Sequence, residues 1–63
     1  MVVRYDGGVL LAQNGTFEVR GGSDVVYCFS DGKIVLLKKC KDAESAEMYL
    51  DMIASGRDKV DIR

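Results

Sequence analysis

The hydrophobic residues fall into short runs separated by glycine-containing turns, and the strongest run is Val25–Cys40 (VVYCFSDGKIVLLKKC). Two apolar segments flank Asp31-Gly32, a dipeptide that favours a two-residue type I′ turn. The pattern predicts a central β-hairpin in which Phe29 lies opposite Ile34. Because side chains alternate between the two faces of a strand, both faces of this hairpin are apolar. The face that we name the second apolar face carries Val25, Tyr27, Phe29, Ile34 and Leu36.

An earlier pair of strands is predicted on either side of Asn14-Gly15, the strongest short-range hairpin signal. We expect Val9–Gln13 to pair with Thr16–Arg20 across this turn. Met1–Tyr5 is rich in β-branched and aromatic residues and precedes a turn cluster at residues 6–8, so it is expected to form a short first strand.

The glycine-rich segment Gly21–Asp24 is expected to form a four-residue loop that sets Arg20 opposite Val25 and extends the strands into a meander. A slip of one residue in this loop would exchange the faces of the following hairpin. In the expected register, the core face carries Leu10, Ala12, Phe17, Val19, Val26, Cys28, Val35 and Leu37.

A helix is predicted from Ala43 to Ser55. Asp42 is a favourable N-cap, and Gly56 is expected to end the helix. At about 100° per residue, the apolar positions gather on one side, which we expect to face the sheet. The centre of that side carries Ala46, Leu50 and Ile53.

Met48 and Met52 lie one helical turn apart and away from the sheet-facing side, and we expect Met48 in particular to be exposed. After the helix, Lys59–Arg63 alternates polar and apolar residues. This alternation predicts a short edge strand with Val60 and Ile62 pointing inward.

Together these elements predict a single α+β domain over residues 1–63. The expected fold has two layers: an antiparallel β-meander of about five strands, with one helix packed across one face and a short C-terminal edge strand. The alternative is a small, partly open β-barrel capped by the helix, because short strands with glycine corners also build barrels.

Composition is that of an ordinary globular chain, with 48% hydrophobic and 30% charged residues. A chain this short buries only about 60% of its unfolded surface, so a partner or a second copy would add useful stability. The first residues, MVVRYDGG, lack the features of a signal peptide, and no apolar run approaches the roughly 18 residues that span a bilayer. We therefore expect a cytoplasmic protein that has no membrane segment.

The two cysteines are predicted to remain reduced. In the expected hairpin register, Cys40 lies five residues along the strand from the residue opposite Cys28, a separation of roughly 17 Å. A disulfide requires Cα atoms within about 7 Å. We expect Cys28 to be a buried apolar residue, and Cys40, flanked by lysines, to be the more reactive thiol.

Residues that commonly carry catalysis or bind metals are scarce. The chain has no histidine, which removes the commonest general base and the commonest metal ligand. Two cysteines without histidine do not make a tetrahedral zinc site, and neither glycine-rich turn opens a helix as a phosphate-binding loop does. We expect a protein that is not an enzyme and that has no catalytic residue, metal site or cofactor.

A basic cluster is formed by Lys38, Lys39 and Lys41. The surrounding segment GKIVLLKKCKDAESAEMYL, in which a strand leads into a helix, resembles the end of the small three-stranded arm-binding domains of phage-type integrases. Those domains are basic, whereas this chain has a net charge of −1. Nucleic-acid binding through the lysines, with Tyr27 or Tyr49 as a stacking platform, is therefore the alternative function.

The main expectation is a small non-enzymatic protein–protein interaction module, of the kind that a phage or mobile element encodes to modulate or inhibit a host macromolecule. This expectation rests on the second apolar face, because a soluble monomer rarely leaves a large apolar face uncovered. A homodimer through the second apolar face would cover it. The residues expected to bind a partner are Val25, Tyr27, Phe29, Ile34, Leu36, Met48 and Met52.

Overall fold

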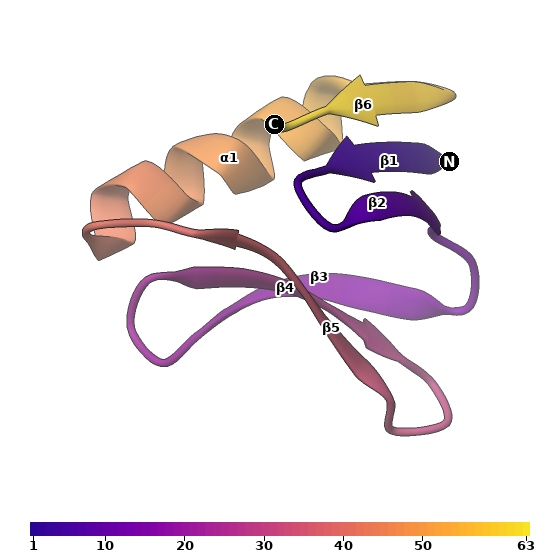
Figure 1. Cartoon of the computed structure of the whole chain (residues 1–63), viewed down its shortest axis with the longest axis horizontal. Coiled ribbons are helices and arrows are strands. Elements are labelled where there is room, and N and C mark those ends of the chain that lie inside the picture. The colour runs from indigo at the N-terminus through magenta and orange to yellow at the C-terminus, as the bar shows by residue number, and fades with distance from the viewer.

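The computed structural model describes residues 1–63 and contains six strands and one helix in the predicted order (Figure 1). The strands and the helix are β1 (Val2–Tyr5), β2 (Gly8–Leu11), β3 (Gly15–Arg20), β4 (Asp24–Phe29), β5 (Ile34–Lys39), α1 (Ala43–Ser55) and β6 (Lys59–Asp61). The α+β class is thus confirmed.

The strands form two three-stranded sheets, with strand orders β2-β1-β6 and β3-β4-β5. The second sheet is an antiparallel meander, as predicted. In the first sheet β1 pairs antiparallel with β2 and parallel with β6, so β6 is the predicted C-terminal edge strand. Helix α1 packs against β3 and β4, and the strands do not close into a barrel. Figure 1 shows the β4–β5 turn projecting away from the helix.

The predicted hairpin around Asn14-Gly15 is wrong, because β2 pairs with β1 and β3 pairs with β4. Asn14 adopts a left-handed conformation (φ 59°) and marks a corner between the two sheets. Its carbonyl accepts a 2.8 Å hydrogen bond from the Ser30 N–H, which extends the β3–β4 ladder by one step. Asn14 and Gly15 therefore form the connection between the two sheets. Asparagine suits this connection as it suits a type I′ turn, because both use a left-handed backbone conformation.

Both predicted loops of the meander are wrong by one residue. Arg20 lies opposite Asp24, which leaves a three-residue loop. The β4–β5 loop also has three residues: the Gly32 N–H donates to the Phe29 carbonyl at 3.0 Å, and Gly32 takes a positive φ of 98°. This is the three-residue hairpin in which a type I turn is followed by a left-handed glycine.

The first of these shifts exchanges the faces of β4, because a slip of one residue turns every side chain over. A β-bulge then leaves Leu37 of β5 as an extra residue opposite the step from Val25 to Val26. Beyond the bulge, Val25 lies opposite Lys38, as the sequence predicts. Val25, Tyr27 and Leu37 are consequently buried in the core, whereas Cys28 lies on the opposite face from Tyr27. The predicted core face is right for β5 at Val35 and Leu37. On β4 the predicted face is wrong, although Val26 is buried there as predicted, at 5% exposed, and Cys28 is half-buried.

Tyr27 is the largest fully buried side chain, 2% exposed. Its ring lies edge-on between the rings of Phe17 and Phe29, with centroids 4.8 Å away in each case. Such edge-to-face contacts add about 0.5–1.5 kcal/mol to burial of the rings. The rest of the buried cluster comes from both sheets and the helix and comprises Val3, Leu10, Val25, Leu37, Ala46, Ile53, Val60 and Ile62.

The helix begins and ends where the sequence predicts. The Asp42 carboxylate accepts a 2.8 Å hydrogen bond from the Ser45 N–H, as an N-cap does. Gly56 ends the helix with an ordinary φ of −75°, so a left-handed conformation is not the reason for glycine. A Cβ at this position would collide with Val60, and glycine is thus required for the close approach of β6. Ala46 and Ile53 are buried and Leu50 is half-buried, which confirms the predicted sheet-facing side.

Candidate protein-interaction surfaces

The large exposed hydrophobic side chains occur as three spaced pairs. Two pairs lie two residues apart on a strand, and the third lies four residues apart on the helix, so each pair shares one face. The exposed fractions are 61% and 62% for Val9 and Leu11 on β2, 50% each for Ile34 and Leu36 on β5, and 65% and 46% for Met48 and Met52 on α1.

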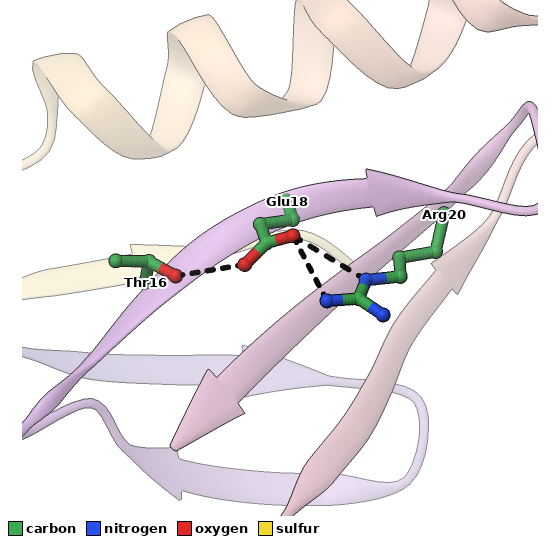
Figure 2. A network of polar contacts seen from close by, with 3 residues as sticks. All are labelled: Thr16, Glu18 and Arg20. Atoms are coloured by element: carbon green, nitrogen blue, oxygen red, sulfur yellow. Dashed lines mark hydrogen bonds and ion pairs between the residues drawn. The ribbon is translucent and has the colours of Figure 1, made fainter. Parts of the chain in front are cut away.

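The outer face of the meander changes from polar to apolar between its two edges. On β3, Glu18 accepts hydrogen bonds from the Thr16 hydroxyl at 3.0 Å and from Arg20 Nη2 at 3.2 Å (Figure 2). The opposite edge carries Ile34 and Leu36 on the same face. Charged side chains along an edge strand discourage pairing with other chains. The β3 edge is therefore protected, whereas the β5 edge is unprotected at Ile34 and Leu36.

Backbone groups on the free edge of β5 point outward at the two exposed residues. The Phe29 N–H donates to the Lys33 carbonyl at 2.8 Å, which makes Phe29 and Lys33 a hydrogen-bonded pair. Since antiparallel pairs alternate, Tyr27–Val35 is the next hydrogen-bonded pair, and the N–H and C=O of Ile34 and Leu36 face away from β4. Because β5 is an edge strand, these four groups have no partner in the sheet.

Strand β2 has a similar free edge. The Ala12 N–H donates to the Met1 carbonyl at 2.9 Å, and the same alternation turns the backbone groups of Val9 and Leu11 outward. This strand has four residues, compared with six in β5. Nothing in the sequence showed that Val9 and Leu11 would both lie on a sheet edge.

On the helix, Met48 and Met52 form a ridge that borders a shallow hollow of about 330 Å³. Ser45 and Tyr49 complete the lining of this hollow. We name Met48 and Met52 the methionine ridge. Met48 is exposed, as predicted.

The predicted basic cluster exists. Lys38, Lys39 and Lys41 line a second hollow of about 230 Å³, which shares Ser45 and Tyr49 with the first. The Lys38 Nζ lies 5.9 Å from the centre of the Tyr49 ring and 3.8 Å from Asp6 Oδ2. Lys39 and Lys41 have no carboxylate within ion-pair distance.

The predicted partner-binding residues separate into two groups. Val25 and Tyr27 are buried, so their predicted exposure is wrong, and Phe29 is half-buried beside Tyr27. The shift in the β3–β4 loop turned them into the core. The remaining four are exposed, on two separate elements: Ile34, Leu36, Met48 and Met52.

Both cysteines are free thiols and half-buried. Burial, together with the Glu18 carboxylate on the same face, raises the pKa of Cys28. The hydrogen bond from Thr16 and the neighbouring Arg20 lower the pKa of Glu18. At the C-terminal end, hydrogen bonds from the Arg63 side chain and backbone lower the pKa of Asp61 to about 2.

Comparison with protein families, curated proteins and solved structures finds no match for this chain. No group of three or more metal-ligating side chains gathers in the structure. The helix is too short to cross a membrane.

Proposed function

We propose that this chain is a small non-enzymatic protein-interaction module that binds an extended segment of a partner protein along the free edge of β5. The observation that carries the proposal is the coincidence of two features at Ile34 and Leu36. Each residue presents an exposed apolar side chain and an outward-facing N–H and C=O.

An extended peptide that adds to a sheet edge gains affinity from main-chain hydrogen bonds and specificity from alternate side chains. The β5 edge supplies both. Strand β3 is disfavoured by its polar row of Thr16, Glu18 and Arg20. Strand β2 is disfavoured because it has no charged residue that could recognise a partner segment, whereas β5 carries Lys39.

Charge on β5 favours a particular kind of partner segment. Lys39 lies at the end of the strand, is exposed and has no ion-pair partner. A segment with apolar residues at alternate positions and an acidic residue near Lys39 therefore fits best. The β-bulge at Leu37 limits regular pairing to the first part of β5, so the expected complex is weak and transient.

A module of this size acts by occupying part of a larger molecule. We therefore propose modulation or inhibition of a partner macromolecule as its role, consistent with an origin in a phage or mobile element. The cytoplasm, where thiols remain reduced, is the proposed location, since both cysteines are free.

A random-peptide display library tests the binding mode. We expect selection on the immobilised protein to enrich acidic peptides with alternating apolar residues. Leu36→Pro should abolish binding of these peptides, because proline removes an outward-facing N–H that the folded monomer does not use. Leu11→Pro makes the matched change on β2 and should preserve binding. The proposal would be contradicted if the enriched peptides bound Leu36→Pro with the same affinity as the wild type.

A second candidate, nucleic-acid binding, is favoured by one observation: three lysines line one hollow with Tyr49. Tyr27 is buried and leaves Tyr49 as the stacking platform. An electrophoretic shift with mixed DNA and RNA that weakens steeply with salt would support this function. Absence of a shift at low salt and about 100 μM protein, the weak end of typical non-specific dissociation constants at physiological salt, would exclude it.

A further inference from the structure

We propose that a second copy of this chain packs on the methionine ridge, so that the two helices lie side by side and parallel about a two-fold axis. The apolar centre of this surface is distinct from Ile34 and Leu36 on the β5 edge, and the proposal does not depend on the function proposed above. The expected homodimer therefore uses the helix in place of the sheet face that the sequence suggested.

The ridge lies between two strips of opposite charge. At about 100° per residue, Glu44, Glu47 and Asp51 lie on one side of Met48 and Met52. Ser45 and Tyr49 lie on the other side, and both also line the hollow that holds the lysines. An apolar ridge thus separates an acidic strip from a lysine-lined one.

The acidic strip has no compensating charge within the chain. None of Glu44, Glu47 and Asp51 makes an ion pair. Glu47 and Asp51 are four residues apart, and like charges at this spacing destabilise a helix by about 0.2–0.5 kcal/mol. Lysines from a second copy would relieve this repulsion.

The lysine strip is similarly uncompensated. Lys39 and Lys41 have no carboxylate partner, although Lys38 has Asp6 at 3.8 Å. Lys41 lies just before the N-cap Asp42, at the same end of the helix as Glu44. Lys41 and Glu44 therefore lie at comparable heights along the helix axis, whereas Glu47 and Asp51 lie further along it.

Symmetry selects the parallel arrangement. A two-fold axis along the helix exchanges the two sides of the ridge, so the acidic strip of each copy faces the lysine strip of the other. A two-fold axis across the helix makes the helices antiparallel and brings like strips together. Only the parallel arrangement is complementary in charge, with Met48 of one copy positioned to enter the hollow of the other.

A helix of 13 residues offers a modest contact area, so we expect a weak dimer at the small end of specific interfaces. Sedimentation equilibrium from about 10 μM to 1 mM, a range suited to interfaces of that class, should show the wild type approaching twice the mass of one chain. A monomer across this range would overturn the proposal.

Two substitutions identify which surface of the chain forms the dimer contact. Met48→Lys should weaken association at least tenfold, because it places a charge in the apolar contact, whereas the position is exposed in the monomer and should leave the melting temperature unchanged. Leu36→Lys is the matched control on β5 and should leave association intact. If Leu36→Lys dissociates the dimer and Met48→Lys does not, the dimer contact lies on the sheet and the proposal is overturned.

A charge-reversal pair tests the orientation. Glu44→Lys and Lys41→Glu should each weaken self-association, because each homodimer then opposes like charges twice. An equimolar mixture of the two variants should form a heterodimer in which both contacts join opposite charges. If the mixture associates no better than either variant alone, the parallel arrangement is wrong.

Discussion

The backbone of Gly15 lies directly against the ring of Tyr27, so that a Cβ at position 15 would stand 2.8 Å from the ring carbon Cζ. The same Cβ would also collide with the Cys28 carbonyl. Because this contact lies at the corner between the two sheets, it fixes how the chain passes from β2 into the meander.

Gly15→Ala should destabilise the protein by about 1–3 kcal/mol, the typical cost of inserting a methyl group into a close contact. Thr16→Ala, at the neighbouring exposed position, is the control and should change stability little. Urea unfolding of the two variants measures the difference. Equal midpoints would show that the approach of Gly15 to Tyr27 is not needed for folding.

Ile53→Ala should cost about 2–5 kcal/mol, because this side chain is 2% exposed in the core between helix and sheets. A loss of that size is comparable with the whole stability of a small domain. Met48→Ala, at a position that is 65% exposed, should cost much less at concentrations where the protein is monomeric. If thermal melts show a greater loss of stability for Met48→Ala than for Ile53→Ala, the other side of the helix faces the sheets.

Acid should weaken the contact between Asp61 and Arg63. The folded-state pKa of Asp61, about 2, lies below its ordinary value of 3.8. A lowered folded-state pKa contributes stability above the ordinary pKa, and this contribution is lost as the pH falls through the folded-state value. Asp61→Asn should therefore lower the melting temperature near pH 6 and have a smaller effect near pH 2, where about half of the folded-state carboxylates are protonated. A melting-temperature difference that stays constant with pH would contradict this assignment.

Cys28 should react more slowly than Cys40 with a thiol reagent, because burial and the Glu18 carboxylate raise the pKa of Cys28. Glu18→Gln should speed the labelling of Cys28 by at most about tenfold, the change in thiolate population that one pKa unit gives. Glu47→Gln is the control on the helix and should have no effect. Mass spectrometry after timed labelling separates the two thiols, and faster labelling of Cys28 in the wild type would contradict the prediction.

The order of the elements and the ends of the helix could be predicted because each rests on local chemistry. Asp42 caps the helix through a hydrogen bond only three residues away. Hydrophobic periodicity likewise placed Ala46 and Ile53 inward. Such signals do not depend on distant parts of the chain.

The strand pairing could not be predicted because it depends on which strands the whole fold brings together, such as β6 beside β1. Asn14-Gly15 suits both a tight hairpin turn and a corner between sheets, and the choice follows from the pairing of β1 with β2. The loops at Gly21–Ser23 and Ser30–Gly32 differ from the expected ones by one residue. One residue is enough to bury Tyr27 and to leave Ile34 and Leu36 as the exposed part of the predicted surface.

Amide hydrogen exchange of the protein, with and without an acidic peptide enriched by selection, tests the binding mode at β5 most directly. We expect the amides of Ile34 and Leu36 to exchange rapidly in the free protein and to slow down when the peptide binds. The amides of Val9 and Leu11, which face outward on the other free edge, should exchange at unchanged rates. Protection at Val9 and Leu11, or protection confined to the helix, would contradict peptide addition at β5.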